Sequence, residues 1–195
     1  MTRKVAVIVG SLRQGSFNRL TAHALAGLAP RGLELEIVEI GDLPFYDQDL
    51  DEGEAPAAWT AFRETIRGYD AVLFLTPEYN RSMPAVIKNA IDVGSRPYGS
   101  SVWAGKPAAV ASVSMSPLGG FGANHHLRQA LVFLDMPILQ QPEAYFGNAG
   151  TFFDAEGKLA NEGTEKVFQA FINAFARWIE TILGAEAGAV RAEAA

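Results

Sequence analysis

The chain has 195 residues, of which 49% are hydrophobic and 19% charged, so it is long enough for one well-buried core and too short to need two. Its formal net charge of -6 argues against general affinity for nucleic acid or an anionic membrane, because both require a basic surface. It contains no cysteine, which excludes disulfides, thiolate nucleophiles and cysteine-bound metals, and its three histidines leave little for a metal site.

Apolar runs that predict strands alternate with helical patterns along the chain. Residues 5–9, 71–76 and 108–114 are apolar on both faces, as central parallel strands are, whereas residues 33–40 alternate and predict an edge strand. Residues 43–51 form an aromatic and acidic excursion that fits no regular element. A shorter fifth strand is expected near residues 137–140. The spacing of apolar residues predicts helices at 18–29, 55–67, 84–94, around 127–134, and at 162–183.

Five strands alternating with helices predict an α/β fold, a doubly wound parallel sheet with right-handed crossovers and helices on both faces. The edge-like second strand favours the flavodoxin-like order 2-1-3-4-5 over a dinucleotide-binding Rossmann domain. In that order the ligand lies beyond the carboxyl ends of strands 1 and 3. The polar loops after Val9, Thr76 and Ser114 are therefore expected to converge on one site.

We expect a single domain over residues 1–183 and a disordered tail over 184–195, which is rich in Ala and Glu. No apolar run approaches the roughly 20 residues of a transmembrane helix. The first strand begins too close to Met1 for a signal peptide. These features predict a cytoplasmic protein without a membrane partner.

The first polar loop, residues 10–18, follows a buried strand and runs into a helix. It is neither a Walker A motif nor Gly-x-Gly-x-x-Gly. Hydroxyls, an amide, one guanidinium and the N–H groups of a helix N-terminus nevertheless suit a phosphate. The alternative is an ordinary helix cap with a solvated arginine. The side chains that would bind a phosphomonoester are Ser11, Arg13, Ser16 and Asn18.

The second and third loops suit a heteroaromatic ring. Residues 77–80 offer a rigid turn and an aromatic face, but no nucleophile with a paired base. Gly119 and Gly120 allow a backbone to come close to such a ring, although a glycine pair is more often only a turn. His125 and His126 are adjacent on a predicted helix, and we interpret them as surface or interface residues.

Together these segments resemble the NAD(P)H-dependent FMN reductase family, which includes chromate, quinone and azo-dye reductases. The first motif is Gly-Ser-Leu-Arg-x-x-Ser-x-Asn at 10–18, and the second is Pro-Glu-Tyr-Asn-x-Ser-x-Pro-x-x-x-Lys-Asn-Ala-Ile-Asp at 77–92. The glycine pair follows them, and residues 43–49 are similar to a loop of the same family. The similarity extends from Lys4 to about Ile182.

The resemblance implies a flavodoxin-like homodimer, or a dimer of dimers, with one FMN per subunit and NAD(P)H as co-substrate. Hydride would pass from nicotinamide to N5 of FMN and then to a quinone, azo dye, chromate or free flavin by a ping-pong mechanism. No catalytic side chain and no metal are then expected. The FMN phosphate would be held by Ser11, Arg13, Ser16 and Asn18, and the ring bordered by Pro77, Glu78, Tyr79, Asn80, Ser114 and Gly120.

One departure from the family pattern concerns the third loop. Relatives often carry a basic residue just after the paired glycines, whereas this chain has Phe121 and Gly122. How the charge of the nicotinamide nucleotide is met, and hence the preference for NADH or NADPH, therefore stays open. Two other functions also stay open at this point: a flavodoxin-like electron carrier, which typically cradles phosphate without an arginine, and a non-catalytic flavin-binding protein.

Overall fold

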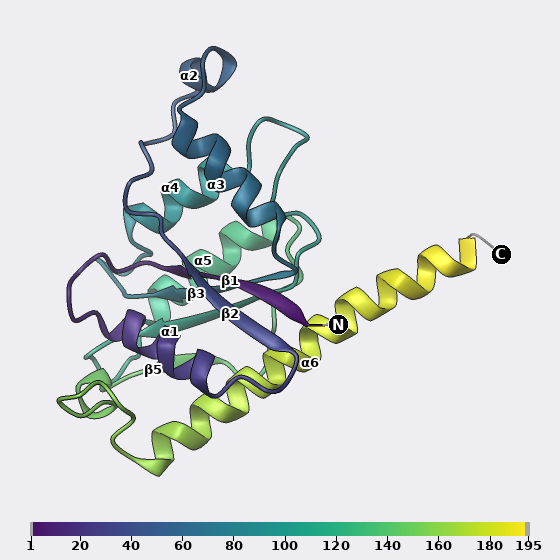
Figure 1. The fold of residues 1–195 in the computed structure, drawn as a ribbon. Coiled ribbons are helices and arrows are strands. Elements are labelled where there is room, and N and C mark those ends of the chain that lie inside the picture. The colour runs from purple at the N-terminus through teal and green to yellow at the C-terminus, as the bar shows by residue number, and fades with distance from the viewer. Residues whose placement is uncertain (1, 194–195) are drawn as a thin grey trace.

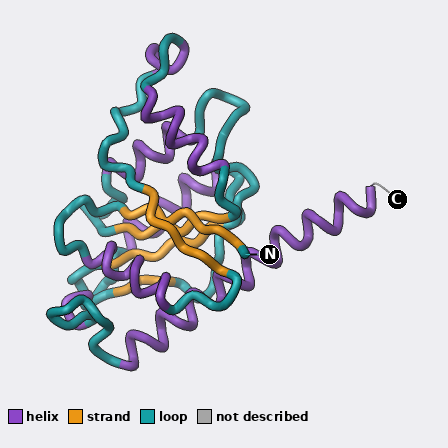
Figure 2. The backbone as a smooth tube through the Cα atoms, viewed as in Figure 1, coloured by secondary structure: helices purple, strands orange, loops and turns teal. Residues whose placement is uncertain are grey.

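A computed structural model describes residues 2–193 of the chain. Its centre is a five-stranded sheet in which every neighbouring pair of strands is parallel, in the order β2-β1-β3-β4-β5 (Figures 1 and 2). This confirms the flavodoxin-like topology predicted from the sequence. The strands are β1 (Arg3–Val9), β2 (Leu33–Val38), β3 (Ala71–Thr76), β4 (Ala108–Val113) and β5 (Ala144–Phe146).

Helices cover both faces of the sheet (Figure 1). In β1, Val5 and Val7 pack with the core under α1 and α6, whereas Ala6 and Ile8 pack with the core under α3, α4 and α5. Consecutive strand residues point to opposite faces, so a strand covered on both sides must be apolar throughout. The helices are α1 (Phe17–Gly27), α2 (Gln48–Glu52), α3 (Ala57–Arg67), α4 (Ala85–Gly94), α5 (Phe121–Phe133) and α6 (Glu162–Glu193), with a 3-10 turn, η1 (Ala149–Thr151).

The fifth strand does not lie where the sequence predicted it. The apolar segment near Ile138 makes only an isolated bridge to Ala108, at the start of β4. The chain then leaves the sheet and returns as β5, which pairs with the carboxyl half of β4 up to the Val113 and Phe146 pair. Between the Ala108 and Ile138 bridge and the Ala111 and Ala144 pair, β4 advances by three residues while this segment advances by six, so the two pieces cannot form one continuous strand.

The excursion at 43–51 contains one short helix, α2, that the sequence did not predict. Asp47 caps it, since its carboxylate accepts a hydrogen bond from the backbone N–H of Asp49 at 3.0 Å. None of the five residues of α2 is buried as a whole. A helix this short has no apolar periodicity, which is why the sequence pattern gave no sign of it.

The last helix continues beyond its predicted end near Leu183. In the structure α6 runs to Glu193 and projects from the body of the molecule (Figure 1). Alanine and glutamate are strong helix formers, which fits the helical conformation of residues 184–193. Residues 194 and 195 of that tail lie outside the described residues. Across residues 2–193, no helix combines the length and apolar character that crossing a bilayer requires.

Candidate functional site

Three loops meet at the edge of the sheet where β1, β3 and β4 end. The backbone N–H of Gly10 donates to Leu75 at 2.8 Å, which ties the start of the first loop to β3. The side-chain amide of Asn18 donates to the carbonyl of Val113, the last residue of β4, at 3.4 Å. The segments that follow β1, β3 and β4 therefore lie side by side, because parallel strands end at the same edge.

The first loop combines two buried serines with an exposed arginine. Ser11 and Ser16 are buried. Ser16 caps α1, since its hydroxyl accepts from the N–H of Arg19 at 3.3 Å, so the capping interpretation holds for this residue. A hydroxyl that accepts one hydrogen bond can still donate another, so the cap does not exclude a bound anion. Arg13 donates to the carbonyl of Gly15 at 3.3 Å, and its guanidinium lies 5.8 Å from the ring centre of Phe17.

An unsatisfied acceptor lies beneath this loop. Asn18 is 3% exposed, and within the described residues its Oδ1 has no hydrogen-bond partner. One turn along α1, the hydroxyl oxygen of Thr21 is buried without a partner in the same region. Buried polar atoms are nearly always paired, so an unpaired amide oxygen on the residue that ends the first loop fits a ligand that carries hydroxyl groups as well as a phosphate.

The second loop contains a tight turn in an uncommon conformation. The backbone N–H of Tyr79 donates to Ser82 at 3.0 Å, and the N–H of Ser82 donates back to Tyr79 at 3.0 Å. Between them Asn80 and Arg81 have φ values of 51° and 66°, in the left-handed region that disfavours most side chains. Such strain concentrates at functional sites. The turn leaves the Tyr79 ring 53% exposed.

Glu78 links the second loop to the helix after the third. Its Oε2 accepts the backbone N–H of Ala123, in the first turn of α5, at 3.0 Å. Its Oε1 accepts from Arg81 at 3.2 Å, and the carboxylate side chain is only 13% exposed. A carboxylate is favourable at a helix N-terminus. The sequence predicted that this residue borders a ring, largely through its backbone, but did not predict the cap.

The third loop depends on its glycine pair. Gly119 and Gly120 have φ values of 61° and 74°. A Cβ on Gly119 would lie 2.6 Å from the carbonyl group of Tyr145, and a Cβ on Gly120 would lie 3.0 Å from Cβ of Ser112. The backbone therefore approaches both β4 and β5 at a distance that only glycine permits. Ser114 shapes the start of the loop, because its hydroxyl accepts from the N–H of Ser116 at 3.1 Å.

The two histidines point to different sides of α5, as adjacent helical residues must. His126 Nδ1 lies 3.0 Å from the hydroxyl oxygen of Ser82, which joins α5 to the second loop. His125 Nε2 lies 2.8 Å from the hydroxyl of Tyr145, and that hydroxyl donates to Glu143 at 2.9 Å. Burial and the hydrogen bond to Glu143 raise the pKa of the Tyr145 hydroxyl. The phenol is therefore neutral at pH 7. The sequence showed neither contact.

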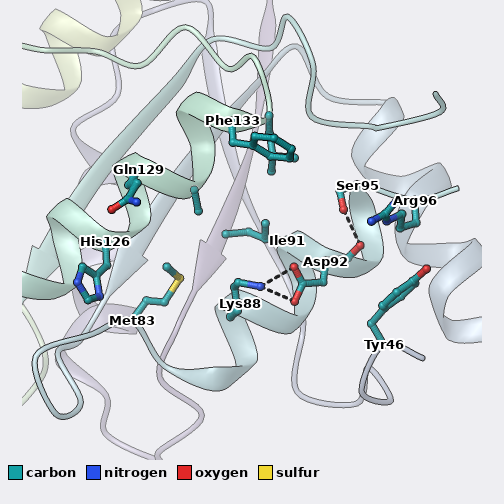
Figure 3. A pocket seen from close by; sticks show the side chains of 12 residues that line it. Tyr46, Met83, Lys88, Ile91, Asp92, Ser95, Arg96, His126, Gln129 and Phe133 are labelled. Carbon is teal, nitrogen blue, oxygen red and sulfur yellow. Dashed lines mark hydrogen bonds and ion pairs between the residues drawn. The ribbon is translucent and has the colours of Figure 1, made fainter. Parts of the chain in front are cut away.

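A groove of about 820 Å³ lies between α4 and α5 (Figure 3). One of its ends is near the second loop, and the groove extends from there along the two helices. Met83 and His126 lie at the end nearest the second loop, and Phe133 lies further along α5, the helix that carries His126. Lys88 and Asp92 form an ion pair at 2.7 Å within it. Phe133 is 89% exposed, so a large apolar surface is open on this face of the molecule.

The excursion at 43–52 forms one wall of that groove through Tyr46. Asn89 of α4 holds it in place: its Oδ1 accepts from the N–H of Tyr46 at 2.8 Å, and its Nδ2 donates to the carbonyl oxygens of Leu43 and Pro44. The indole of Trp59 also donates to Pro44, at 3.0 Å. The second motif thus fixes this excursion, in addition to supplying the second loop.

Comparison with known proteins gives the same family as the sequence motifs. Residues 3–151 match the family model described as NADPH-dependent FMN reductase. A quinone reductase of Pseudomonas putida is 61% identical over 176 residues, which cover 90% of this chain and 94% of that protein. A 2-hydroxy-1,4-benzoquinone reductase of Burkholderia sp is 46% identical and is covered to 97%, with 92% of this chain matched. The solved structure of FerB, a flavoenzyme NAD(P)H:(acceptor) oxidoreductase from Paracoccus denitrificans, has a TM-score of 0.87 at 42% identity, covering 92% of this chain and 98% of that one.

Proposed function

Because the chain belongs to the NADPH-dependent FMN reductase family, we propose that it is an NAD(P)H-dependent flavoenzyme that reduces quinones by a ping-pong mechanism. As a member of this family, the chain is an oxidoreductase with FMN as cofactor and NAD(P)H as co-substrate. The observation that carries the choice of quinone is the 61% identity to the quinone reductase over nearly the whole chain. Azo dyes, chromate and free flavin are the other acceptors that the motifs suggest, and a quinone is preferred to them on this identity.

The proposed FMN site consists of the three loops. In this proposal Ser11 and Ser16 donate to the phosphate with the N–H groups that open α1, and Arg13 adds a positive charge. The burial of both serines and the position of Ser16 at the start of α1 support this. The orphaned Asn18 Oδ1 is suited to a ribityl hydroxyl rather than to the phosphate itself, which refines the role predicted from the sequence.

The ring would lie between the second and third loops. The backbone of Pro77, Glu78, Tyr79 and Asn80 borders one side, with Ser114 and Gly120 near the other. When bound there, FMN would supply the hydride-transfer chemistry that connects the nicotinamide to the second substrate. In this proposal the side chains contribute binding and orientation. The exposed Tyr79 and Phe121 give the site an apolar rim that suits a planar acceptor.

FMN-binding and steady-state kinetic assays on the purified protein test this function directly. We expect it to bind FMN, to oxidise NADH or NADPH only when FMN is bound, and to pass the electrons to a benzoquinone with parallel double-reciprocal plots. FMN binding without NAD(P)H oxidation would instead support an electron carrier or a non-catalytic flavin-binding protein. Intersecting plots would exclude the ping-pong mechanism, and faster turnover with an azo dye, chromate or free FMN would overturn the choice of quinone.

The groove between α4 and α5 supports the proposal of a homodimer. Phe133, which is 89% exposed, lines this groove together with Ile91 and Leu134, and a two-fold contact requires a self-complementary surface. We infer that a second copy of the chain covers this face. Sedimentation velocity of the same preparation should give the mass of two chains, or of four for a dimer of dimers. A monomer at micromolar concentration contradicts the proposal.

Arg13→Ala tests the phosphate end of the site. We expect it to weaken FMN binding by about 1.5 to 3 kcal/mol, the contribution of a hydrogen bond to a charged group. Quenching of FMN fluorescence measures the affinity. Arg31→Ala is the matched control, because Arg31 is also exposed but precedes β2 at the opposite edge of the sheet. Unchanged FMN affinity in the Arg13 variant removes this residue from the proposed site.

A further inference from the structure

We propose that Arg81 binds a phosphate group of the nicotinamide dinucleotide and so supplies the positive charge that the third loop lacks. The inference rests on the proposed function, since it concerns the co-substrate of that reaction. Residues 114–122 contain no lysine or arginine. In the three loops, 10–18, 77–82 and 114–122, the only lysine or arginine residues are Arg13 and Arg81. With Arg13 assigned to the FMN phosphate, Arg81 is left for the second anion.

The backbone holds Arg81 at a defined point beside the proposed ring site. It is the third residue of the turn from Tyr79 to Ser82, which is closed by two hydrogen bonds of 3.0 Å. Its φ of 66° places the side chain where an extended or helical residue could not. An arginine in this conformation costs of order 1 to 3 kcal/mol, a strain that is expected where the residue has a function.

The guanidinium is anchored on one side and open on the other. Among the described residues, its hydrogen bond is from Nη1 to Glu78 Oε1 at 3.2 Å, and the side chain is 73% exposed. Glu78 shares its charge with the N-terminus of α5 through Ala123, so the carboxylate does not serve Arg81 alone. A guanidinium has five N–H donors in a planar fork that matches phosphate, and most of them face solvent here.

The charge of the whole chain makes a local cation necessary. A net charge of -6 repels a nucleotide that carries two or more negative charges. Two phosphate-bearing molecules must occupy the same edge of the sheet, one as cofactor and one as co-substrate. Arg13 follows β1 and Arg81 follows β3, so the structure provides one cation on each of two separate loops rather than a single cluster.

Titration of the FMN-loaded enzyme with NADP⁺ and NAD⁺ in a calorimeter tests the assignment. Arg81→Gln should weaken binding on the order of tenfold, the effect of losing one charge-assisted hydrogen bond. The same variant should show a shallower dependence of affinity on salt, because one ion pair is lost. Arg31→Gln is the matched control and should bind both nucleotides as the unmodified enzyme does. Arg81→Lys retains the charge and should recover part of the affinity.

The two nucleotides distinguish which phosphate is bound. A larger loss for NADP⁺ than for NAD⁺ assigns Arg81 to the 2′-phosphate, and an equal loss assigns it to the pyrophosphate; both support the proposal. Unchanged affinity for both nucleotides overturns it, as does an equal loss of FMN affinity in Arg81→Gln. Failure of the unmodified chain to bind FMN or to oxidise NAD(P)H is a separate result, because it overturns the proposed function itself.

Discussion

Gly119→Ala is expected to destabilise the protein by about 2 to 5 kcal/mol and to weaken FMN binding at the same time. Left-handed backbone with a Cβ costs roughly 1 to 2 kcal/mol. The new methyl would also lie 2.6 Å from the carbonyl carbon and oxygen of Tyr145, and overpacking adds about 1 to 3 kcal/mol. The clash is with backbone, so no side-chain rotation relieves it. The third loop must then move away from β5, and the proposed ring site moves with it.

A variant at a second glycine separates the cost of the left-handed backbone from the cost of the clash with Tyr145. Gly99 has a φ of 81°, but nothing lies within 4 Å of the position that its Cβ would take. Gly99→Ala should therefore cost only the backbone strain and leave FMN affinity unchanged. Urea unfolding gives the free energy of each variant, and FMN fluorescence gives the affinity. Equal destabilisation of the two variants would show that the close approach to Tyr145 contributes nothing.

The fold was predictable because its central strands are apolar on both faces. Val5 to Val9, Ala71 to Thr76 and Ala108 to Val113 have no polar side except where each strand ends, and this pattern is typical of strands in a sheet covered on both sides. The fifth strand was misplaced because β5 is three residues long and stands after a proline. Its position depends on pairing with β4, which is a contact between distant parts of the chain.

The convergence of the three loops was predictable, but the contacts between them were not. Parallel strands that end at one edge bring their loops together whatever the loop sequences are, so the convergence follows from topology. The cap that Glu78 provides for α5 and the contact of His126 with Ser82 join residues 44 or 45 positions apart. No local pattern reports such pairs. The left-handed conformation of Arg81 was equally invisible, because arginine is not a residue that marks such turns.

Buried charge explains why the excursion at 43–52 has a defined structure. Arg63 of α3 donates to both carboxylate oxygens of Asp51, at 2.8 and 3.0 Å, and the two side chains are 6% and 5% exposed. The Nε of Arg63 also donates to the carbonyl of Val93, at the end of α4, at 2.8 Å. One ion pair therefore holds α2 against α3 and α4. The sequence pattern placed Arg63 on a helix but gave no reason to bury it.

Asp51→Asn is expected to destabilise the protein by about 3 to 5 kcal/mol, because the Arg63 charge would remain buried without its partner. Asp49→Asn is the matched control, since Asp49 lies on the same short helix but is exposed. Urea unfolding measures both. A cost below about 1 kcal/mol, the value of an exposed ion pair, would show that water reaches the Arg63 guanidinium when Asp51 is replaced.

The double variant Asp51→Leu with Arg63→Met then separates pairing from packing. Replacing a buried ion pair by apolar side chains of similar volume is often neutral, so this variant should be more stable than Asp51→Asn alone. It lacks the hydrogen bonds from Arg63 to Asp51 and Val93, however, and these fix the excursion that carries Tyr46. If the pair exists to position that wall of the α4 and α5 groove, the double variant will regain stability while its dimer dissociates at a higher concentration than that of the unmodified chain. Recovery of both properties would mean that packing alone holds the wall in place.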